Sequence, residues 1–390
     1  MPRTAGPLRV ALVAGEASGD VLGAGLIDAI RASAADVSFF GIAGQRMIDA
    51  GCEPWHRIEE LSVMGLAEVL PHLPRLLSLR RRLIARIKKL RPDVFVGIDS
   101  SDFNLPVAAA LKAAGIPAVQ YGSPQVWAWR QSRVSKVRSA TDLVLCLLPF
   151  ETEFYAEHDV NARFVGHPLA DAIPLTVDAD RARARLGLSG DDPVVAILPG
   201  SRRAEITRLS RPFLATARWL RRERPGVRFV VALANEEASA ICRAEADRLE
   251  LEPPPLFVTG RAREVLAAAD AVLTASGTAA LEALLLKRRM VVAHRLSGPT
   301  YWLARRMGIQ RLPHFSLPNL LAGRELVPEF VQAEVRPDIL GPALLGCLQA
   351  DALDPDFRAE LAVIHEQLRQ NASASAADAV LKLAVRESTP

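Results

Sequence analysis

Short apolar runs, many of them β-branched, recur along the chain and are separated by longer amphipathic stretches. A continuous apolar run of about four to eight residues is typical of a strand in a parallel sheet, because helices cover both faces of such a sheet. In the first part of the chain we expect strands at Arg9–Ala14, Val37–Gly41, Pro92–Ile98, Gly115–Tyr121, Leu143–Leu148 and Arg163–Val165. The stretches between them predict helices, so this part has the pattern of an α/β domain.

The alternation stops around Asp171–Asp180, where the apolar periodicity is lost and Pro174 suggests a linker. A second series of strands is then predicted at Val194–Leu198, Arg228–Leu233, Leu256–Val258, Ala271–Leu273 and Met290–Ala293. The stretch Pro337–Val385 reads as surface helices. We therefore predict two doubly wound α/β domains, residues 1–172 and 173–350, with a cleft between them, followed by a helical segment at residues 351–390.

The predicted strand Val194–Leu198 ends in a turn with Gly200 and Ser201, and Arg202 and Arg203 stand where a helix begins. Free backbone N–H groups and the helix dipole favour an anion at such a point. An arginine adds a planar, charged fork that suits phosphate oxygens. The stretch is equally consistent with an ordinary strand-to-helix turn that carries two solvated arginines.

A second turn of this kind contains Ser276, Gly277 and Thr278, and Glu282 lies one turn inside the helix that follows. The hydroxyls and amides suit an anion, and the carboxylate could bind a ribose diol. Glu282 could also simply complement the helix dipole. The polar loop from Ser316 to Glu325, which includes Asn319, has no obvious packing reason for its polarity.

In the first domain, polar residues follow two of the predicted strands. Glu16, Ser18 and Gly19 come after the first strand, where open α/β sheets bind ligands, although Ser18 or Asp20 could instead cap a helix. Asp99 comes directly after Pro92–Ile98 and is our candidate for a general base. A structural alternative here is helix capping by Asp102 or Ser101.

The loop Ser123–Arg130 contains Ser123, Gln125, Trp127 and Trp129. Its tryptophans could stack on a sugar, line an acyl chain or simply pack in the domain core.

The segment Leu61–Leu90 combines leucines at helical spacing with a dense basic face, and Pro71 and Pro74 are expected to break or kink its first part. Between Ser62 and Arg91 there are eight basic residues and one acidic residue, an excess of 8 − 1 = +7, whereas the whole chain carries +4. This pattern suits a helix at an anionic membrane surface. It equally suits a core-packed helix with a solvated basic face. A nucleic-acid surface is less favoured because no aromatic residues interleave with the basic ones.

Composition narrows the function classes. With 390 residues, 50% hydrophobic and 24% charged, the chain has the composition of a globular protein of two domains. The four cysteines are scattered, which argues against zinc and disulfides and fits a reducing cytoplasm. We find no signal-peptide pattern, no apolar run near ~18 residues, no dinucleotide fingerprint and no phosphate-binding P-loop. These absences favour a substrate that carries its own phosphates, such as a nucleotide-sugar.

Nine segments, spread in order over nearly the whole chain, resemble the lipid-A-disaccharide synthase family. They are GEASGD (Gly15–Asp20), LSVMGLAEVLPHLPRLL (Leu61–Leu77), GIDSSDFN (Gly97–Asn104), SPQVWAWR (Ser123–Arg130), LPFE (Leu148–Glu151), FVGHP (Phe164–Pro168), LPGSRRAE (Leu198–Glu205), ASGTAALE (Ala275–Glu282) and SLPNLLAGRELV (Ser316–Val327).

The resemblance implies a GT-B glycosyltransferase, with two Rossmann-like domains, that needs neither metal nor cofactor. Its reaction would join UDP-2,3-diacylglucosamine to 2,3-diacylglucosamine 1-phosphate in lipid A biosynthesis, with inversion, to give a β-1,6 disaccharide 1-phosphate and UDP. It further implies a homodimer, with the helices of residues 351–390 on the N-terminal domain or a partner chain. The enzyme would sit peripherally on the cytoplasmic face of the inner membrane and would bind no nucleic acid.

The resemblance also implies roles for individual residues, with Asp99 as the base and Arg202 as the contact to the diphosphate. The donor would be bound by Gly200, Ser201, Arg202, Ser276, Gly277, Thr278, Glu282 and Asn319. The acceptor side of the cleft would be lined by Glu16, Ser18, Gly19, Ser123, Gln125 and Trp127. The membrane would be contacted by Leu70, Leu73, Leu76, Leu77, Arg80 and Arg81. The sequence departs from the family's usual residues at Ser101, Gln120, Gly122 and His314.

Two other functions fit parts of the pattern. An epimerase acting on a UDP-sugar would use two similar domains, but it would not need the leucine- and arginine-rich segment. A non-enzymatic lipid-surface module would use that segment, but it would need neither Asp99 nor Arg202.

Overall fold

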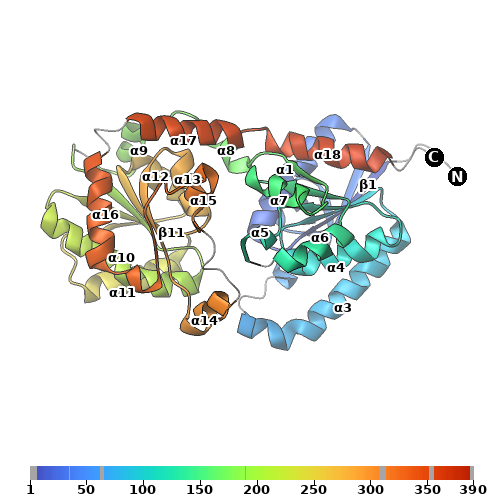
Figure 1. The fold of residues 1–390 in the computed structure, drawn as a ribbon, viewed down its shortest axis with the longest axis horizontal. Coiled ribbons are helices and arrows are strands. Elements are labelled where there is room, and N and C mark those ends of the chain that lie inside the picture. Colours follow the sequence, from blue (N-terminus) through green and yellow to red (C-terminus); the bar gives the residue numbers. More distant parts are fainter. Residues whose placement is uncertain are drawn as a thin grey trace. The chain divides into compact units, whose positions relative to one another are not determined.

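The computed structural model describes residues 7–386 except residues 35, 62–65, 130, 189, 307–312 and 351–354. The chain forms two compact units, one made of Met1–Asp171 with Leu368–Pro390 and the other of Ala172–Gln367 (Figure 1). The first division lies one residue before the boundary expected after residue 172. The predicted C-terminal segment, residues 351–390, is divided between the two units, and each unit holds one of its two helices.

The first unit contains a seven-stranded parallel sheet in the order β3-β2-β1-β4-β5-β6-β7. Its strands are β1 (Leu8–Ala14), β2 (Val37–Ala43), β3 (Cys52–Arg57), β4 (Val94–Ile98), β5 (Ala118–Tyr121), β6 (Leu143–Cys146) and β7 (Ala162–Phe164). The predicted strands are all present with shifted ends. The edge strand β3 was not predicted, because its sequence is polar and contains Pro54.

Helices surround this sheet (Figure 1). They are α1 (Ala17–Ser33), α2 (Gln45–Asp49), α3 (Leu66–Leu90), α4 (Ser101–Lys112), α5 (Val126–Trp129), α6 (Val134–Ala140), α7 (Phe150–Ala156), α8 (Pro168–Ala172), which reaches the boundary of the unit, and α18 (Ala372–Arg386). The last of these packs on α1 and buries Ala376, Ala377 and Val380 in the core of the first unit.

The second unit contains a six-stranded parallel sheet in the order β10-β9-β8-β11-β12-β13. The strands are β8 (Val194–Leu198), β9 (Arg228–Leu233), β10 (Leu256–Thr259), β11 (Ala271–Ala275), β12 (Arg289–His294) and the unpredicted edge strand β13 (Glu329–Val331). The helices are α9 (Ala179–Arg185), α10 (Arg203–Glu223), α11 (Glu236–Arg248), α12 (Ala262–Ala268), α13 (Thr278–Leu285), α14 (Gly298–Arg306), α15 (Leu317–Ala322), α16 (Pro337–Ala350) and α17 (Pro355–Leu368).

Both sheets confirm the predicted α/β class, and each has a point where the strand order reverses. In the first sheet β1 lies between β2 and β4, and in the second β8 lies between β9 and β11. The loops after the two adjacent central strands leave in opposite directions there, which opens a crevice at the carboxyl ends of the strands. In the first unit these loops carry Glu16 and Asp99. In the second they carry Arg202 and Ser276.

Residues 66–90 of the basic segment form α3, a single helix that continues through Pro71 and Pro74, so the prolines, which were expected to break or kink it, do not break it. Leu79, Leu83 and Ile87 recur every four residues and are buried in the core, and α3 packs on α4. The second half of α3 is thus a core helix with a solvated basic face. None of the described helices is both long enough and apolar enough to cross a membrane.

Candidate functional site

In the first unit, Ser18 and Asp99 meet at the crevice between β1 and β4. The Ser18 hydroxyl, on the first turn of α1, donates to Asp99 Oδ2 at 2.9 Å. Glu16 is exposed at the start of α1, and Gly19 is buried beside the carboxyl end of β4. The predicted neighbours Glu16, Ser18 and Asp99 therefore lie at one edge of the sheet.

Asp99 has the properties of a proton acceptor. Burial raises the pKa of its carboxyl, the hydrogen bond from Ser18 opposes this shift, and the negative charge of Glu16 adds to it. A carboxylate with a raised pKa is a stronger base.

The backbone at Asp99 is strained. Asp99 and Ser100 have φ values of 49° and 35°, in the left-handed region that non-glycine residues rarely adopt. Such conformations cost about 1–3 kcal/mol each and persist only when the surrounding structure imposes them.

Two buried amides impose this conformation, and the sequence alone did not identify either of them. Asn104 Nδ2 donates to the carbonyl oxygens of Val13, Ile98 and Asp99 at 3.1–3.2 Å. Gln120 Nε2 donates to the carbonyl oxygens of Asp99 and Gly122 at 3.0 and 3.1 Å. Both residues are at most 1% exposed. Together they fix the direction in which the Asp99 side chain leaves the sheet.

Gly122 keeps the second carboxylate oxygen accessible. Its φ is +85°, and a Cβ at this position would lie 2.5 Å from Asp99 Oδ1. A larger residue here would therefore press on the candidate base.

The loop with Ser123 and Trp127 is held by Glu151, another residue whose importance the sequence did not indicate. Trp127 Nε1 donates to Glu151 Oε1 at 3.2 Å, and the Leu148 amide donates to Oε2 at 3.1 Å. Burial raises the pKa of Glu151 to about 7, against these hydrogen bonds. The Ser123 hydroxyl also lies 3.1 Å from the Tyr155 hydroxyl. Gln125, which lies between Ser123 and Trp127 in the sequence, is exposed.

The other acids near these loops have structural partners. Asp20 accepts hydrogen bonds from the amides of Arg46 and Met47, both at 3.0 Å, so it caps α2 and not its own helix. Asp102 pairs with Arg133. Neither Asp102 nor Ser101 caps α4, because the residue at its N-cap is Ser100.

In the second unit, the backbone N–H groups at the start of α10 are bound by Glu205, a side chain of the same helix. Glu205 Oε2 accepts from the amides of Ser201 and Arg202 at 3.2 and 3.4 Å. Gly200 has a φ of +122°, and a Cβ there would lie 2.7 Å from Glu205. The backbone anion site predicted at this turn is thus partly filled by a carboxylate.

The Arg202 side chain remains presented to solvent. It is 71% exposed, and its Nη1 lies 3.8 Å from Glu205 Oε1. Arg203 is 77% exposed, as expected of a solvated arginine, and also pairs with Glu237 at 2.7 Å. The guanidinium of Arg202 is therefore the feature of this turn best suited to an anionic ligand.

The start of α13 is more open than that of α10. Gly277 and Thr278 are exposed, and the N-cap residue Gly277 has no side chain with which to cap the helix. Ser276 Oγ makes a long contact of 3.4 Å to the Phe315 carbonyl. Glu282 accepts from Arg263 Nε at 2.8 Å, so its carboxylate already has a cationic partner on α12.

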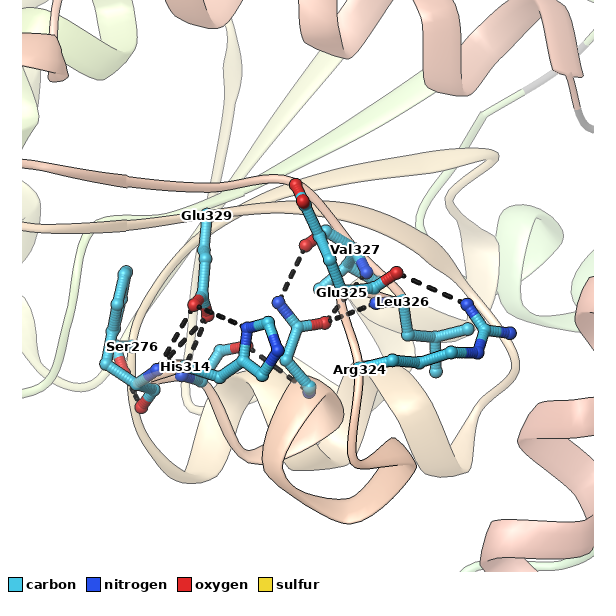
Figure 2. Close-up of polar contacts among 10 residues, drawn as sticks. Ser276, His314, Arg324, Glu325, Leu326, Val327 and Glu329 are labelled. Atoms are coloured by element: carbon cyan, nitrogen blue, oxygen red, sulfur yellow. Dashed lines mark hydrogen bonds and ion pairs between the residues drawn. The ribbon is translucent and has the colours of Figure 1, made fainter. Parts of the chain in front are cut away.

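The first part of the segment expected as a polar loop forms α15, and Asn319 is buried on this helix. Asn319 Oδ1 accepts from the amides of Leu326 and Val327, both at 2.8 Å, and its Nδ2 donates to the Val327 carbonyl at 2.9 Å. Leu326 and Val327, which follow the helix, are labelled in Figure 2. Because its side-chain amide makes these hydrogen bonds, Asn319 holds the conformation of the chain at Leu326 and Val327.

Glu329, on β13, fixes the other side of this loop (Figure 2). It accepts from the amides of Phe315 and Ser316 and lies 3.3 Å from His314 Nδ1. His314, one of the departures from the family pattern, is therefore tied to an acid that holds the loop beside Ser276.

The residues expected at the membrane divide into two groups. Leu73 is 42% exposed, and Arg81 is also exposed, whereas Leu76, Leu77 and Arg80 are half-buried. The side chain of Leu70 lies outside the described part of the chain.

Within the described residues, no group of three or more His, Cys, Asp or Glu side chains is arranged to hold a metal ion.

Solved structures with the same architecture include a UDP-GlcNAc 2-epimerase from Neisseria meningitidis bound to UDP-GlcNAc. Its TM-score is 0.65 at 13% sequence identity, with 96% of this chain and 100% of that chain covered. A calicheamicin glycosyltransferase gives a TM-score of 0.58 at 16% identity, with 98% of this chain and 100% of that chain covered. At these identities the likeness shows the GT-B fold alone.

Sequence comparison identifies the family. The lipid-A-disaccharide synthetase family matches residues 10–382. Lipid-A-disaccharide synthase of Pseudomonas aeruginosa (strain UCBPP-PA14) is 52% identical over 382 residues, which cover 97% of this chain and 99% of that protein. The enzyme of Klebsiella pneumoniae (strain 342) is 49% identical, with 97% and 98% covered. The chain therefore belongs to the lipid-A-disaccharide synthase family of glycosyltransferases.

Proposed function

We propose that this protein transfers a 2,3-diacylglucosaminyl group from UDP to the 6-hydroxyl of 2,3-diacylglucosamine 1-phosphate. The products are UDP and the β-1,6 disaccharide 1-phosphate of lipid A biosynthesis. Family membership supports the reaction. The position of Asp99 at the crevice supports its assignment as the residue that accepts the proton.

Asp99 is proposed as the general base of a single displacement. The acceptor hydroxyl attacks the anomeric carbon, its proton passes to Asp99, and the bond from that carbon to the UDP oxygen breaks. Since Ser18 donates to Oδ2 and Gly122 leaves room at Oδ1, Oδ1 is the oxygen that receives the proton. A positioned base of this kind contributes typically about 10²–10⁴-fold to the rate.

The departing UDP gains negative charge as the bond breaks, and a cation is needed near its diphosphate. We assign this role to the Arg202 guanidinium, with the uncapped start of α13 at Gly277 and Thr278 as a second donor of hydrogen bonds. Ser201, Gly200, Glu282 and Asn319 would shape the donor pocket. The reaction requires that the sugar held here reach the acceptor held at Asp99.

Both substrates carry acyl chains, so we propose peripheral contact with the cytoplasmic face of the inner membrane. Support comes from the exposed Leu73 and from the basic face of α3, which includes Arg81. An apolar edge beside arginines binds anionic lipid surfaces. A homodimer is proposed from family resemblance alone.

Two substitutions test the assignment of Asp99 and Arg202. Asp99→Ala is expected to lower kcat by about 10²-fold or more while the KM for the UDP-sugar changes little. Arg202→Ala is expected to impair use of the UDP-sugar strongly. Steady-state UDP release measures both, and Arg203→Ala is the matched control. Near-normal turnover of the Asp99 variant, or equal effects at Arg202 and Arg203, would refute the assignment.

A further inference from the structure

Three arginines surround an open depression on the second unit that the proposed chemistry does not use. Arg208 and Arg211 lie on α10, and Arg295 follows directly after β12. The depression has a volume of about 380 Å³, and its remaining lining residues are Thr207, Pro212, Leu296 and Ser297.

The charge of this cluster is not balanced within the described part of the chain. Among the described residues, Arg208, Arg211 and Arg295 form no ion pair, although Arg202 and Arg203 on the same stretch of chain both have acidic partners. Glu205 lies three residues before Arg208, and its Oε2 already accepts two backbone amides.

Folding alone does not favour this arrangement. Arg208 and Arg211 are three residues apart on one helix face, where like charges repel. Burial lowers the pKa of the His294 imidazole, the negative charge of Glu205 opposes this shift, and the positive charge of Arg208 adds to it, so the charge of Arg208 acts on a neighbouring side chain.

We propose that this arginine pocket binds a phosphate group carried by a lipid. Guanidinium groups bind phosphate oxygens in pairs, and three around one depression can neutralise a monoester or diester. The lining hydroxyls contribute less, because Thr207 donates to the Arg203 carbonyl and Ser297 bonds Thr300. The phosphate has two possible sources, the 1-phosphate of the acceptor sugar and the head group of an anionic phospholipid.

A binding measurement with inorganic phosphate tests the pocket independently of the proposed activity. Phosphate is expected to raise the thermal midpoint of unfolding of the full chain, relative to chloride at equal ionic strength. The double variant Arg208→Gln with Arg211→Gln is expected to lose most of this rise. The control, Arg218→Gln with Arg222→Gln, removes the same charge from the far part of α10 and should keep it. No rise in the wild type, or an equal rise in both variants, would overturn the proposal.

The source of the phosphate is identified by two further measurements, of which the first rests on the proposed function. If the acceptor supplies it, the pocket variant raises the KM for phosphorylated acceptor by about tenfold and leaves the KM for the dephosphorylated lipid unchanged. If a phospholipid supplies it, the variant loses binding to phosphatidylcholine vesicles that contain phosphatidylglycerol, while both KM values stay unchanged. A rise only in the KM for the UDP-sugar would assign the arginines to the donor site and refute a separate pocket. No change in any of these quantities would refute it as well.

Discussion

At the scale of single residues, the base depends on groups that do not touch the substrate. Asp99 and Ser100 hold left-handed backbone conformations, and the side-chain amides of Asn104 and Gln120 both donate to the Asp99 carbonyl. Each of these amides also binds a second part of the sheet. Strain at a reactive residue thus coincides with two rigid, buried donors, which is the arrangement expected of a preorganised base.

Replacing Asn104 tests this arrangement. Asn104→Leu removes the donor that three carbonyl oxygens share, so we expect the free energy of unfolding to fall by roughly 1–3 kcal/mol. The variant should also lower kcat more than it changes either KM, because the base is misplaced. Urea unfolding and UDP-release kinetics give the two quantities. A destabilised variant with wild-type kcat would mean that the amide supports only the fold.

Gln120→His provides the matching conservative change, since the histidine ring keeps an N–H donor. We expect it to retain most of the wild-type kcat, whereas Gln120→Leu should not.

The raised pKa of Glu151 predicts that the free energy of unfolding depends on pH. Its pKa in the folded chain is about 7, above the ordinary value of 4.5, so the folded state holds the proton more tightly than the unfolded state does. The free energy of unfolding should therefore fall as the pH rises from about 4.5 to about 7. Glu151→Gln should remove this part of the dependence, as measured by urea unfolding at several pH values. Parallel curves for both proteins would contradict it.

The sequence located Asp99 and Arg202 because each follows an apolar run, and the ends of parallel strands meet at one sheet edge. It did not assign a role to Asn104, Gln120 or Glu151, because most of their partners are backbone atoms or side chains of other elements. Only the folded chain brings Asn104 to Val13, for instance.

At the scale of elements, α3 shows how one pattern can serve two roles. Leucines at helical spacing predicted either a membrane face or a core face. Leu79 and Leu83 belong to the core, and Leu73 is exposed near the other end. Periodicity does not distinguish these roles, because it records a face of the helix and not its neighbour.

Serine substitutions separate the two parts of α3. Replacing Leu73, Leu76 and Leu77 by serine should weaken binding to anionic vesicles and leave the fold intact, because these side chains are at least partly exposed. The control Leu83→Ala should instead lower the free energy of unfolding by about 2–5 kcal/mol. Vesicle sedimentation and urea unfolding distinguish these effects. Unchanged sedimentation of the serine variant would exclude this edge as the membrane contact.

The short strands at the sheet edges were harder to predict than the central ones. The sequence of β13 is only Glu329–Val331, and Glu329 is needed to hold the loop at His314. An edge strand is covered on fewer sides, so its sequence lacks the continuous apolar run that marked β8 and β11.

At the scale of the whole molecule, the chain repeats one design in two units. Each sheet reverses its strand order once, and each reversal carries the polar loops that the sequence singled out. The division of labour proposed here gives the base to the first unit and the diphosphate contact to the second. Neither unit by itself supplies both groups that glycosyl transfer needs.

The most direct test of this claim is UDP release from UDP-2,3-diacylglucosamine, measured with and without 2,3-diacylglucosamine 1-phosphate in the presence of EDTA. We predict rapid release only when the acceptor is present, with one β-1,6 disaccharide formed for each UDP. Release at the same rate without acceptor would indicate a hydrolase. An epimerised sugar in place of the disaccharide would indicate the chemistry of the structurally similar epimerases, and either result would contradict the account.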